Sequence, residues 1–191
     1  MKKFLNSNQL KLIAVCAMIF DHLLWVIKPG YNNGAAYLIL HTLGRIVAPI
    51  FCFFIAEGAY YTHSRKKYLS RLLIFALISH FTYCFAFGIN FIPFSTGTFF
   101  NQTSIMWSLA LGLIGIIIQD SNIKNIWKTI LTLLLCVLGF PSDWSSVAVM
   151  IVIYNYVYRN NFKKQMLIQT IFSGIYSLVY CLFIDIWYGL I

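Results

Sequence analysis

An arginine near the middle of a long apolar stretch restricts the possible folds of this chain more than any other feature. Residues 36–62 are mostly apolar, and about 20 such residues in a helix cross the ~30 Å hydrocarbon core of a membrane. Arg45 lies inside this stretch, although a guanidinium at that depth costs roughly 2.5–3.5 kcal/mol or more. Arg45 must therefore face a polar interior or an anionic partner.

The composition extends this interpretation to the whole chain. Of 191 residues, 60% are hydrophobic and 10% are charged, with a mean hydropathy of +0.78, whereas soluble domains carry about 25% charged residues. We predict an all-α integral membrane protein with a single transmembrane domain over residues 1–191. The net charge of +9 does not indicate nucleic-acid binding, because the basic residues fall in alternate loops. The five cysteines lie within or beside apolar runs, so no disulfide framework is expected.

Hydropathy and turn residues predict seven spans. They cover approximately residues 9–27, 36–62, 68–88, 103–118, 126–140, 145–158 and 166–184. With the N-terminus inside, twelve Lys and Arg residues lie on the inner side, Lys28 lies outside, and Arg45 is within the membrane. This asymmetry predicts a cytoplasmic N-terminus. The Asn- and Lys-rich loops favour a multi-pass protein of a bacterial cytoplasmic membrane.

Asp21 and His22 are the best partners for Arg45 elsewhere in the chain. Asp21 lies about 15 Å above Lys11 along the first helix, and Arg45 lies about 13 Å below residue 36, so the two depths coincide. Consecutive helices joined by a short loop are antiparallel neighbours. We therefore expect Asp21, His22 and Arg45 to form one polar cluster within the membrane.

Proton transfer is the chemistry that suits such a cluster. Histidine titrates near neutrality, and a neighbouring carboxylate holds its imidazole in one tautomer and stabilises the charged form. Two structural alternatives remain open. Asp21 and Arg45 can form a purely structural ion pair, and His22 can be a histidine that only packs between helices.

Three further residues are candidates for substrate binding. His41 precedes Arg45 by one helical turn and stands toward the outside, where an interfacial role is the alternative. Asp143 lies at the outer turn before residue 145 and is placed to cap the cluster. Glu57 is offset from Arg45 by about 120° around the helix and belongs to a different contact near the cytoplasmic end, where pairing with basic residues is the simpler account.

A basic segment at the inner face consists of Arg65, Lys66, Lys67 and Arg71. It is most simply a topology signal that contacts anionic membrane lipids, and the alternative is binding of a phosphorylated ligand from the cytoplasm. The sequence contains no phosphate-cradling glycine loop, no Cys/His metal site and no serine-nucleophile elbow, so no metal is expected.

These residues resemble the TraX-like membrane proteins, a family named for the factor needed to N-acetylate F pilin and related to larger membrane acyltransferases. The resemblance covers nearly the whole chain. It rests mainly on Asp21-His22 and on the Gly-Arg-x-x-x-Pro-x-Phe pattern within residues 43–51, followed by Glu57-Gly58 and residues 68–79. Residues 143–145 read Asp-Trp-Ser, where the family usually has Asp-Tyr-Gly.

The resemblance implies transfer of an acetyl group from cytoplasmic acetyl-CoA to an amine or hydroxyl at the outer half of the membrane. It implies that the basic segment 65–71 holds the CoA phosphates and that the thioester arm reaches His22. His22 then acts as general base, oriented by Asp21, while Arg45 stabilises the oxyanion. A pilin amine, a cell-wall glycan and a small molecule are all open as acceptors.

Two other functional classes remain open from the residues themselves. A short chain with a polar midplane also suits a substrate-binding or transport subunit for a small molecule. A non-enzymatic assembly partner of a secretion or conjugation apparatus is the third interpretation. Turnover of acetyl-CoA distinguishes the enzyme from both.

Overall fold

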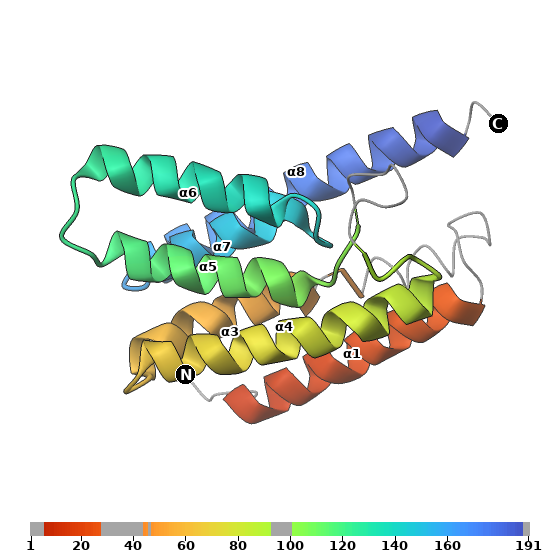
Figure 1. Ribbon diagram of the computed structural model, residues 1–191, viewed down its shortest axis with the longest axis horizontal. Coiled ribbons are helices and arrows are strands. Elements are labelled where there is room, and N and C mark those ends of the chain that lie inside the picture. Colours follow the sequence, from red (N-terminus) through yellow and green to blue (C-terminus); the bar gives the residue numbers. More distant parts are fainter. Residues whose placement is uncertain (1–5, 28–43, 46, 93–100, 189–191) are drawn as a thin grey trace. The chain divides into compact units, whose positions relative to one another are not determined.

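The computed structural model describes residues 6–27, 44–45, 47–92 and 101–188. Every regular element in these ranges is an α-helix, which confirms the all-α class. With the labels of Figure 1, the seven described helices are α1 (Ser7–Ile27), α3 (Val47–Tyr61), α4 (Arg65–Phe87), α5 (Ile105–Gln119), α6 (Asn125–Gly139), α7 (Ser145–Val157) and α8 (Phe162–Tyr188).

The basic residues 65–67 form the first turn of α4, so the prediction of a loop before residue 68 is wrong. Ser64 is the physical reason. Its backbone is extended, and its hydroxyl accepts a hydrogen bond from the amide of Lys67 at 3.4 Å. A serine in this position satisfies one of the amides that the start of a helix leaves without a partner.

The last helix is also longer than predicted at both ends. The side chain of Asn161 accepts a hydrogen bond from the amide of Lys164 at 3.1 Å, so α8 begins at Phe162 rather than near Met166. The same helix continues to Tyr188, beyond the predicted end at residue 184. Lys163 and Lys164 therefore lie in a helical first turn and not in a loop.

The chain forms two compact units, Met1–Phe51 and Cys52–Ile191, and α3 runs across the boundary. A single transmembrane domain over the whole chain stays a prediction.

Helix α5 is the centre of the second unit. It lies between α4 and α6 and packs most extensively against α7 (Figure 1). Its residues 108–113 are all buried. A helix that is apolar on every side is suited to such a central position, because no face of it needs water.

Two glycines allow α5 and α7 to approach closely. A Cβ on Gly112 would lie 2.7 Å from Cβ of Val152, and a Cβ on Gly115 would lie 2.4 Å from Cδ1 of Ile153. Real Cβ atoms do not come this close to other atoms, so larger residues would push the helices apart. Small residues at helix contacts are typical of membrane bundles, where close packing replaces the hydrophobic effect.

The lengths of the helices support membrane crossing only in part. In the described ranges one helix, Arg65–Phe87, is long and apolar enough to cross a membrane, and only 22% of its most apolar window is buried. Helices α3, α5, α6 and α7 are apolar but have 13–15 residues, about 20–23 Å against a ~30 Å core. The seven complete spans are thus not shown.

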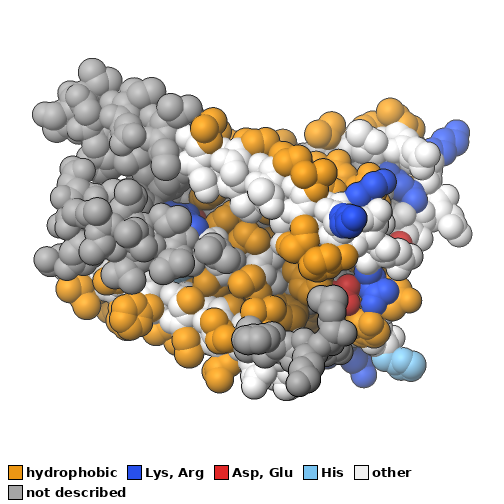
Figure 2. Space-filling model, turned by 180° about the vertical axis from the view of Figure 1, so that it is seen from behind, with side chains coloured by type: hydrophobic (Ala, Val, Ile, Leu, Met, Phe, Trp, Pro, Cys, Tyr) orange, Lys and Arg blue, Asp and Glu red, His pale blue; other side chains and the backbone are white. Residues whose placement is uncertain are grey.

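Apolar side chains cover much of the surface seen in Figure 2. On α4 the exposed residues include Ile74, Phe75, Leu77, Ile78 and Phe85. A water-soluble protein rarely exposes apolar patches of this extent, so these faces are suited to contact with lipid or with another protein.

Candidate functional site

The first unit contains the candidate acid–base residues on α1. This helix begins with a capping box, in which the side chain of Asn6 accepts hydrogen bonds from the amides of Asn8 and Gln9 and the Gln9 side chain accepts from the Asn6 amide. Asp21 and His22 lie in the second half of α1, and both are partly buried.

The imidazole of His22 is oriented by its own helix. Its Nδ1 lies 2.8 Å from the carbonyl oxygen of Met18, one turn earlier. A carbonyl only accepts, so Nδ1 carries the hydrogen and the neutral ring has its lone pair on Nε2. The sequence analysis expected Asp21 to orient this ring, and the backbone carbonyl of Met18 is a further orienting group that sequence reasoning missed.

Asp21 on α1 lies in close contact with Gly44, the glycine of the Gly-Arg pattern. A Cβ at Gly44 would lie 2.5 Å from Cγ and 2.6 Å from Cβ of Asp21. The Asp21 side chain therefore lies directly against the backbone at Gly44, next to Arg45, which is partly buried and has interactions of its own. The structure thus brings Asp21 and the residue before Arg45 together within the first unit. His41 lies outside the described residues.

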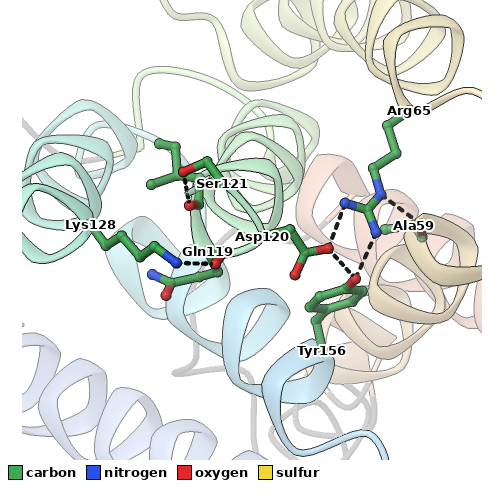
Figure 3. Close-up of polar contacts among 8 residues, drawn as sticks. Ala59, Arg65, Gln119, Asp120, Ser121, Lys128 and Tyr156 are labelled. Atoms are coloured by element: carbon green, nitrogen blue, oxygen red, sulfur yellow. Dashed lines mark hydrogen bonds and ion pairs between the residues drawn. The ribbon is translucent and has the colours of Figure 1, made fainter. Parts of the chain in front are cut away.

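Two ion pairs of the second unit, Arg65–Asp120 and Arg159–Glu57, lie at one end of its helices. We call this the charged end (Glu57, Arg65, Asp120, Tyr156 and Arg159). Figure 3 shows Arg65, Asp120 and Tyr156 pointing toward one another. Arg65 donates to the Asp120 carboxylate at 2.6 Å, to the Tyr156 hydroxyl at 2.6 Å and to the carbonyl of Ala59 at 3.1 Å, and Tyr156 donates to Asp120. Arg65 therefore joins α3, α4, α5 and α7.

Replacing Arg65 with lysine is expected to lower the free energy of unfolding by about 1–2 kcal/mol, because one ammonium cannot direct hydrogen bonds to three separate acceptors. The 30% exposure of the Arg65 side chain keeps the expected loss below that of a buried ion pair. Arg71→Lys is the matched control, since Arg71 is exposed and its hydrogen bond among the described residues is to the Lys67 carbonyl of its own helix. Equal unfolding of both variants in detergent would contradict this account.

Glu57 forms a second ionic contact at the charged end. Arg159, between α7 and α8, donates from Nε to Glu57 at 3.0 Å and from Nη2 to the Tyr61 hydroxyl at 2.7 Å, and its guanidinium lies 3.5 Å from the centre of the Tyr60 ring. Desolvation lowers the pKa of Arg159, but the hydrogen bond and charge of Glu57 and the two tyrosines outweigh it, so the net pKa lies above its ordinary value. Glu57 thus has a structural partner, and its role in substrate binding stays a prediction.

The other members of the basic segment are more accessible than Arg65. Lys66, Lys67 and Arg71 are all exposed on the first two turns of α4. Cations are unfavourable beside the positive end of a helix dipole, and an anion bound there relieves that repulsion. These three side chains are therefore the part of the segment best placed to hold phosphate groups.

Asp143 belongs to the opposite end of the second unit, which we call the serine-rich end (Thr103, Ser104, Ser108, Ser142 and Ser145). The Asp143 amide donates to the Thr103 carbonyl at 2.8 Å, and the Asp143 carboxylate accepts from the Trp144 amide at 3.1 Å. The hydroxyls of Ser108 and Ser142 are buried against each other. Sequence reasoning missed this cluster, and the only signal for it was the density of uncharged polar residues in two distant loops.

The backbone at Trp144 and Ser145 is strained, with φ values of 65° and 48°. Trp144 is buried and stacks on Tyr176 with ring centres 4.5 Å apart, so packing holds the strained turn in place. Ser145 occupies the position where the resembled family usually has glycine, the residue that adopts positive φ without steric cost.

Replacing Ser145 with glycine is expected to raise the free energy of unfolding by about 1 kcal/mol, because the strain is removed while the Ser145 carbonyl still accepts from Ser108. Ser146→Gly is the matched control one residue later and is expected to lower stability by about 0.5 kcal/mol, the usual cost of glycine in a helix. A shift of the same sign in both variants would exclude strain relief at Ser145.

A groove of about 1100 Å³ lies beside the serine-rich end. It is lined by α4, α5, α6, the start of α7 and the loops before α5 and α7, and most of the lining side chains are apolar. His80, Gln102, Thr103 and Ser146 are its polar lining residues apart from Trp107, whose indole NH donates to the Leu138 carbonyl. Within the described parts of the chain, no group of three His, Cys, Asp or Glu side chains is arranged to hold a metal ion.

Comparison with known proteins identifies the family. The family described as TraX protein matches residues 6–187. The chain belongs to the TraX family. It is also 32% identical over 142 residues, 73% of its length, to a protein of Dichelobacter nodosus named probable fimbrial assembly protein FimC, serogroup H1. The matched part spans 57% of that relative. No solved structure matches the chain significantly.

Family membership confirms the resemblance drawn from Asp21-His22 and the Gly-Arg-x-x-x-Pro-x-Phe pattern. The TraX family is associated with acetylation of F pilin, and the relative from Dichelobacter nodosus is named for fimbrial assembly. The roles expected for Asp21, His22, Arg45 and the basic segment stay predictions.

Proposed function

We propose that this TraX-family chain is an integral membrane acetyltransferase that transfers the acetyl group of acetyl-CoA to an amine or hydroxyl of a pilin or fimbrial component. Family membership over residues 6–187 carries the proposal. The His22 ring, with Nδ1 bonded to the Met18 carbonyl, supports it, because a general base needs a fixed ring and an unprotonated nitrogen.

The proposed reaction is an acyl transfer without a metal. The acceptor nitrogen or oxygen attacks the thioester carbonyl while His22 Nε2 takes its proton. Arg45 stabilises the negative charge on the carbonyl oxygen. The C–S bond then breaks, and the proton on His22 passes to the departing CoA thiolate.

We assign the CoA phosphates to Lys66, Lys67 and Arg71 at the start of α4. Arg65 directs its guanidinium to Ala59, Asp120 and Tyr156, so in this proposal it fixes the position of the helix start. Asp21 positions the catalytic helix against Gly44, and His41, Glu57 and Asp143 remain candidates for contact with the acceptor.

The proposed topology places the charged end in the cytoplasm. In the second unit the Lys and Arg residues lie at the starts of α4, α6 and α8 and in the α7–α8 connection, whereas residues 88–104 and 139–146 contain no Lys or Arg. This distribution agrees with the positive-inside rule. The short helices α3, α5, α6 and α7 can be accommodated by local thinning of the bilayer.

The proposal is tested with the purified full chain in detergent, acetyl-CoA and a peptide carrying the N-terminus of a pilin. CoA release is followed with a thiol-reactive dye, with a reaction lacking acetyl-CoA as the control for the five cysteines of the chain. Peptide-dependent release, with an acetylated peptide by mass spectrometry, is the expected result. If acetyl-CoA causes no CoA release and no thermal stabilisation, acetyl transfer is overturned. That result would favour an assembly role, which is the role in the relative's name.

A further inference from the structure

The groove beside the serine-rich end has two apolar walls. One wall comes from Leu73 and Leu77 on α4, and the other comes from Leu133 and Val137 on α6. Leu77 and Val137 are also 60% and 68% exposed, so the walls continue directly into the apolar outer faces of their helices. A ligand can therefore enter the groove sideways from an apolar surrounding.

His80 and Thr103 hydrogen-bond each other at the polar end of the groove. His80 Nε2 lies 2.9 Å from the Phe91 carbonyl and therefore carries a hydrogen, while its Nδ1 lies 3.0 Å from the Thr103 hydroxyl. When the ring is neutral, Nδ1 accepts the hydrogen of the Thr103 hydroxyl. The Thr103 oxygen can then accept a hydrogen bond from a ligand. None of the described lining residues is Asp, Glu, Lys or Arg.

We propose that this groove binds one hydrocarbon chain of a membrane lipid whose head group is uncharged. The apolar walls hold the hydrocarbon chain through close packing contacts. Thr103 accepts a hydrogen bond from a hydroxyl of the head group, and the Ser146 hydroxyl donates to a hydroxyl or ester oxygen. A phosphate head would find no Lys or Arg among the described lining residues, which is unfavourable in an apolar setting.

The size and lining of the groove are those of a pocket for a small apolar ligand. Pockets for small ligands measure about 300–1000 Å³ and are mostly apolar with a few polar groups at fixed places, and this groove of about 1100 Å³ has that character.

The test uses the full chain in detergent and a monoacylglycerol that carries a diazirine in its acyl chain. After illumination, the labelled peptides are identified by mass spectrometry. Labelling is expected within residues 73–80 and 133–140 and should be competed by unlabelled monoacylglycerol. Acetyl-CoA is absent, so the result does not depend on the proposed acetyl transfer.

Matched variants separate the groove from general contact with lipid. Leu77→Trp and Val137→Trp place a large ring in the groove and are expected to lower saturable labelling about tenfold. Ile74→Trp and Leu134→Trp make the same change on the same helices at sites that are 57% and 52% exposed and do not line the groove. These controls are expected to label like the unsubstituted protein.

Two outcomes overturn the proposal. Equal labelling of groove and control variants means that the hydrocarbon chain of the lipid contacts only the outer faces of the helices. Equal competition by lysophosphatidic acid, which has one chain and an anionic head, means that the site does not select an uncharged head. Thermal unfolding of each variant is measured first, and the two groove variants on different helices provide independent readings.

Discussion

His22→Ala is expected to lower acetyl transfer by about 10²–10⁴-fold while the protein remains folded. Alanine removes the nitrogen that accepts the acceptor's proton. The change keeps α1 helical, because alanine is the best helix former and the Met18 carbonyl that bonds the ring lies one turn earlier in the same helix. The loss should appear in kcat, since proton removal takes place in the transition state rather than on binding.

The measurement is CoA release with acceptor at saturating acetyl-CoA. His22→Gln distinguishes base catalysis from packing, because its amide can donate a hydrogen bond but cannot take a proton. His63→Ala is the matched control, since His63 is exposed and lies outside the candidate site. Full activity of the His22→Ala variant would remove His22 from the reaction and leave it as a histidine that packs within its helix.

Gly44→Ala is expected to lower acetyl transfer by about 10²-fold, the size of effect that a misplacement of about 1 Å produces in an active site. The added methyl group would overlap Asp21, both at Cγ and at Cβ. Rotation of the Asp21 side chain moves its Cγ but not its Cβ, so it cannot relieve the overlap with Cβ. The backbone near Arg45 or α1 itself must therefore move. A loss of stability of about 1–3 kcal/mol should accompany the change.

Gly174→Ala in α8 is the matched control, because a Cβ there meets nothing within 4 Å. It should keep full activity and gain a little stability, as alanine is the better helix former. Unchanged activity and unchanged unfolding of Gly44→Ala would show that Asp21 does not lie against Gly44 in the working protein. Asp21→Asn, which keeps the shape and removes the charge, then tests the carboxylate separately.

The sequence was sufficient for the features that depend on local patterns. Apolar runs and turn residues predicted an all-α chain and located α1, α5, α6 and α7 to within two residues at each end. The Asp21-His22 pair and the Gly-Arg-x-x-x-Pro-x-Phe pattern were sufficient for the family. The starts of α4 and α8 were missed because single capping side chains, Ser64 and Asn161, extend each helix into a basic segment that the sequence analysis took for a loop.

The contacts between helices were decided only by the tertiary structure. Arg65 meets Asp120 across 55 positions of the chain and Arg159 meets Glu57 across 102, so neither pair has a signal in local spacing. The Gly-Arg pattern includes Gly44 without giving a reason for the glycine, and only its approach to Asp21 shows why a side chain there is excluded. Hydropathy indicates whether a segment is suited to an apolar surrounding or to water. The partner of a polar group depends instead on which helices become neighbours, and the packing of the whole chain decides this.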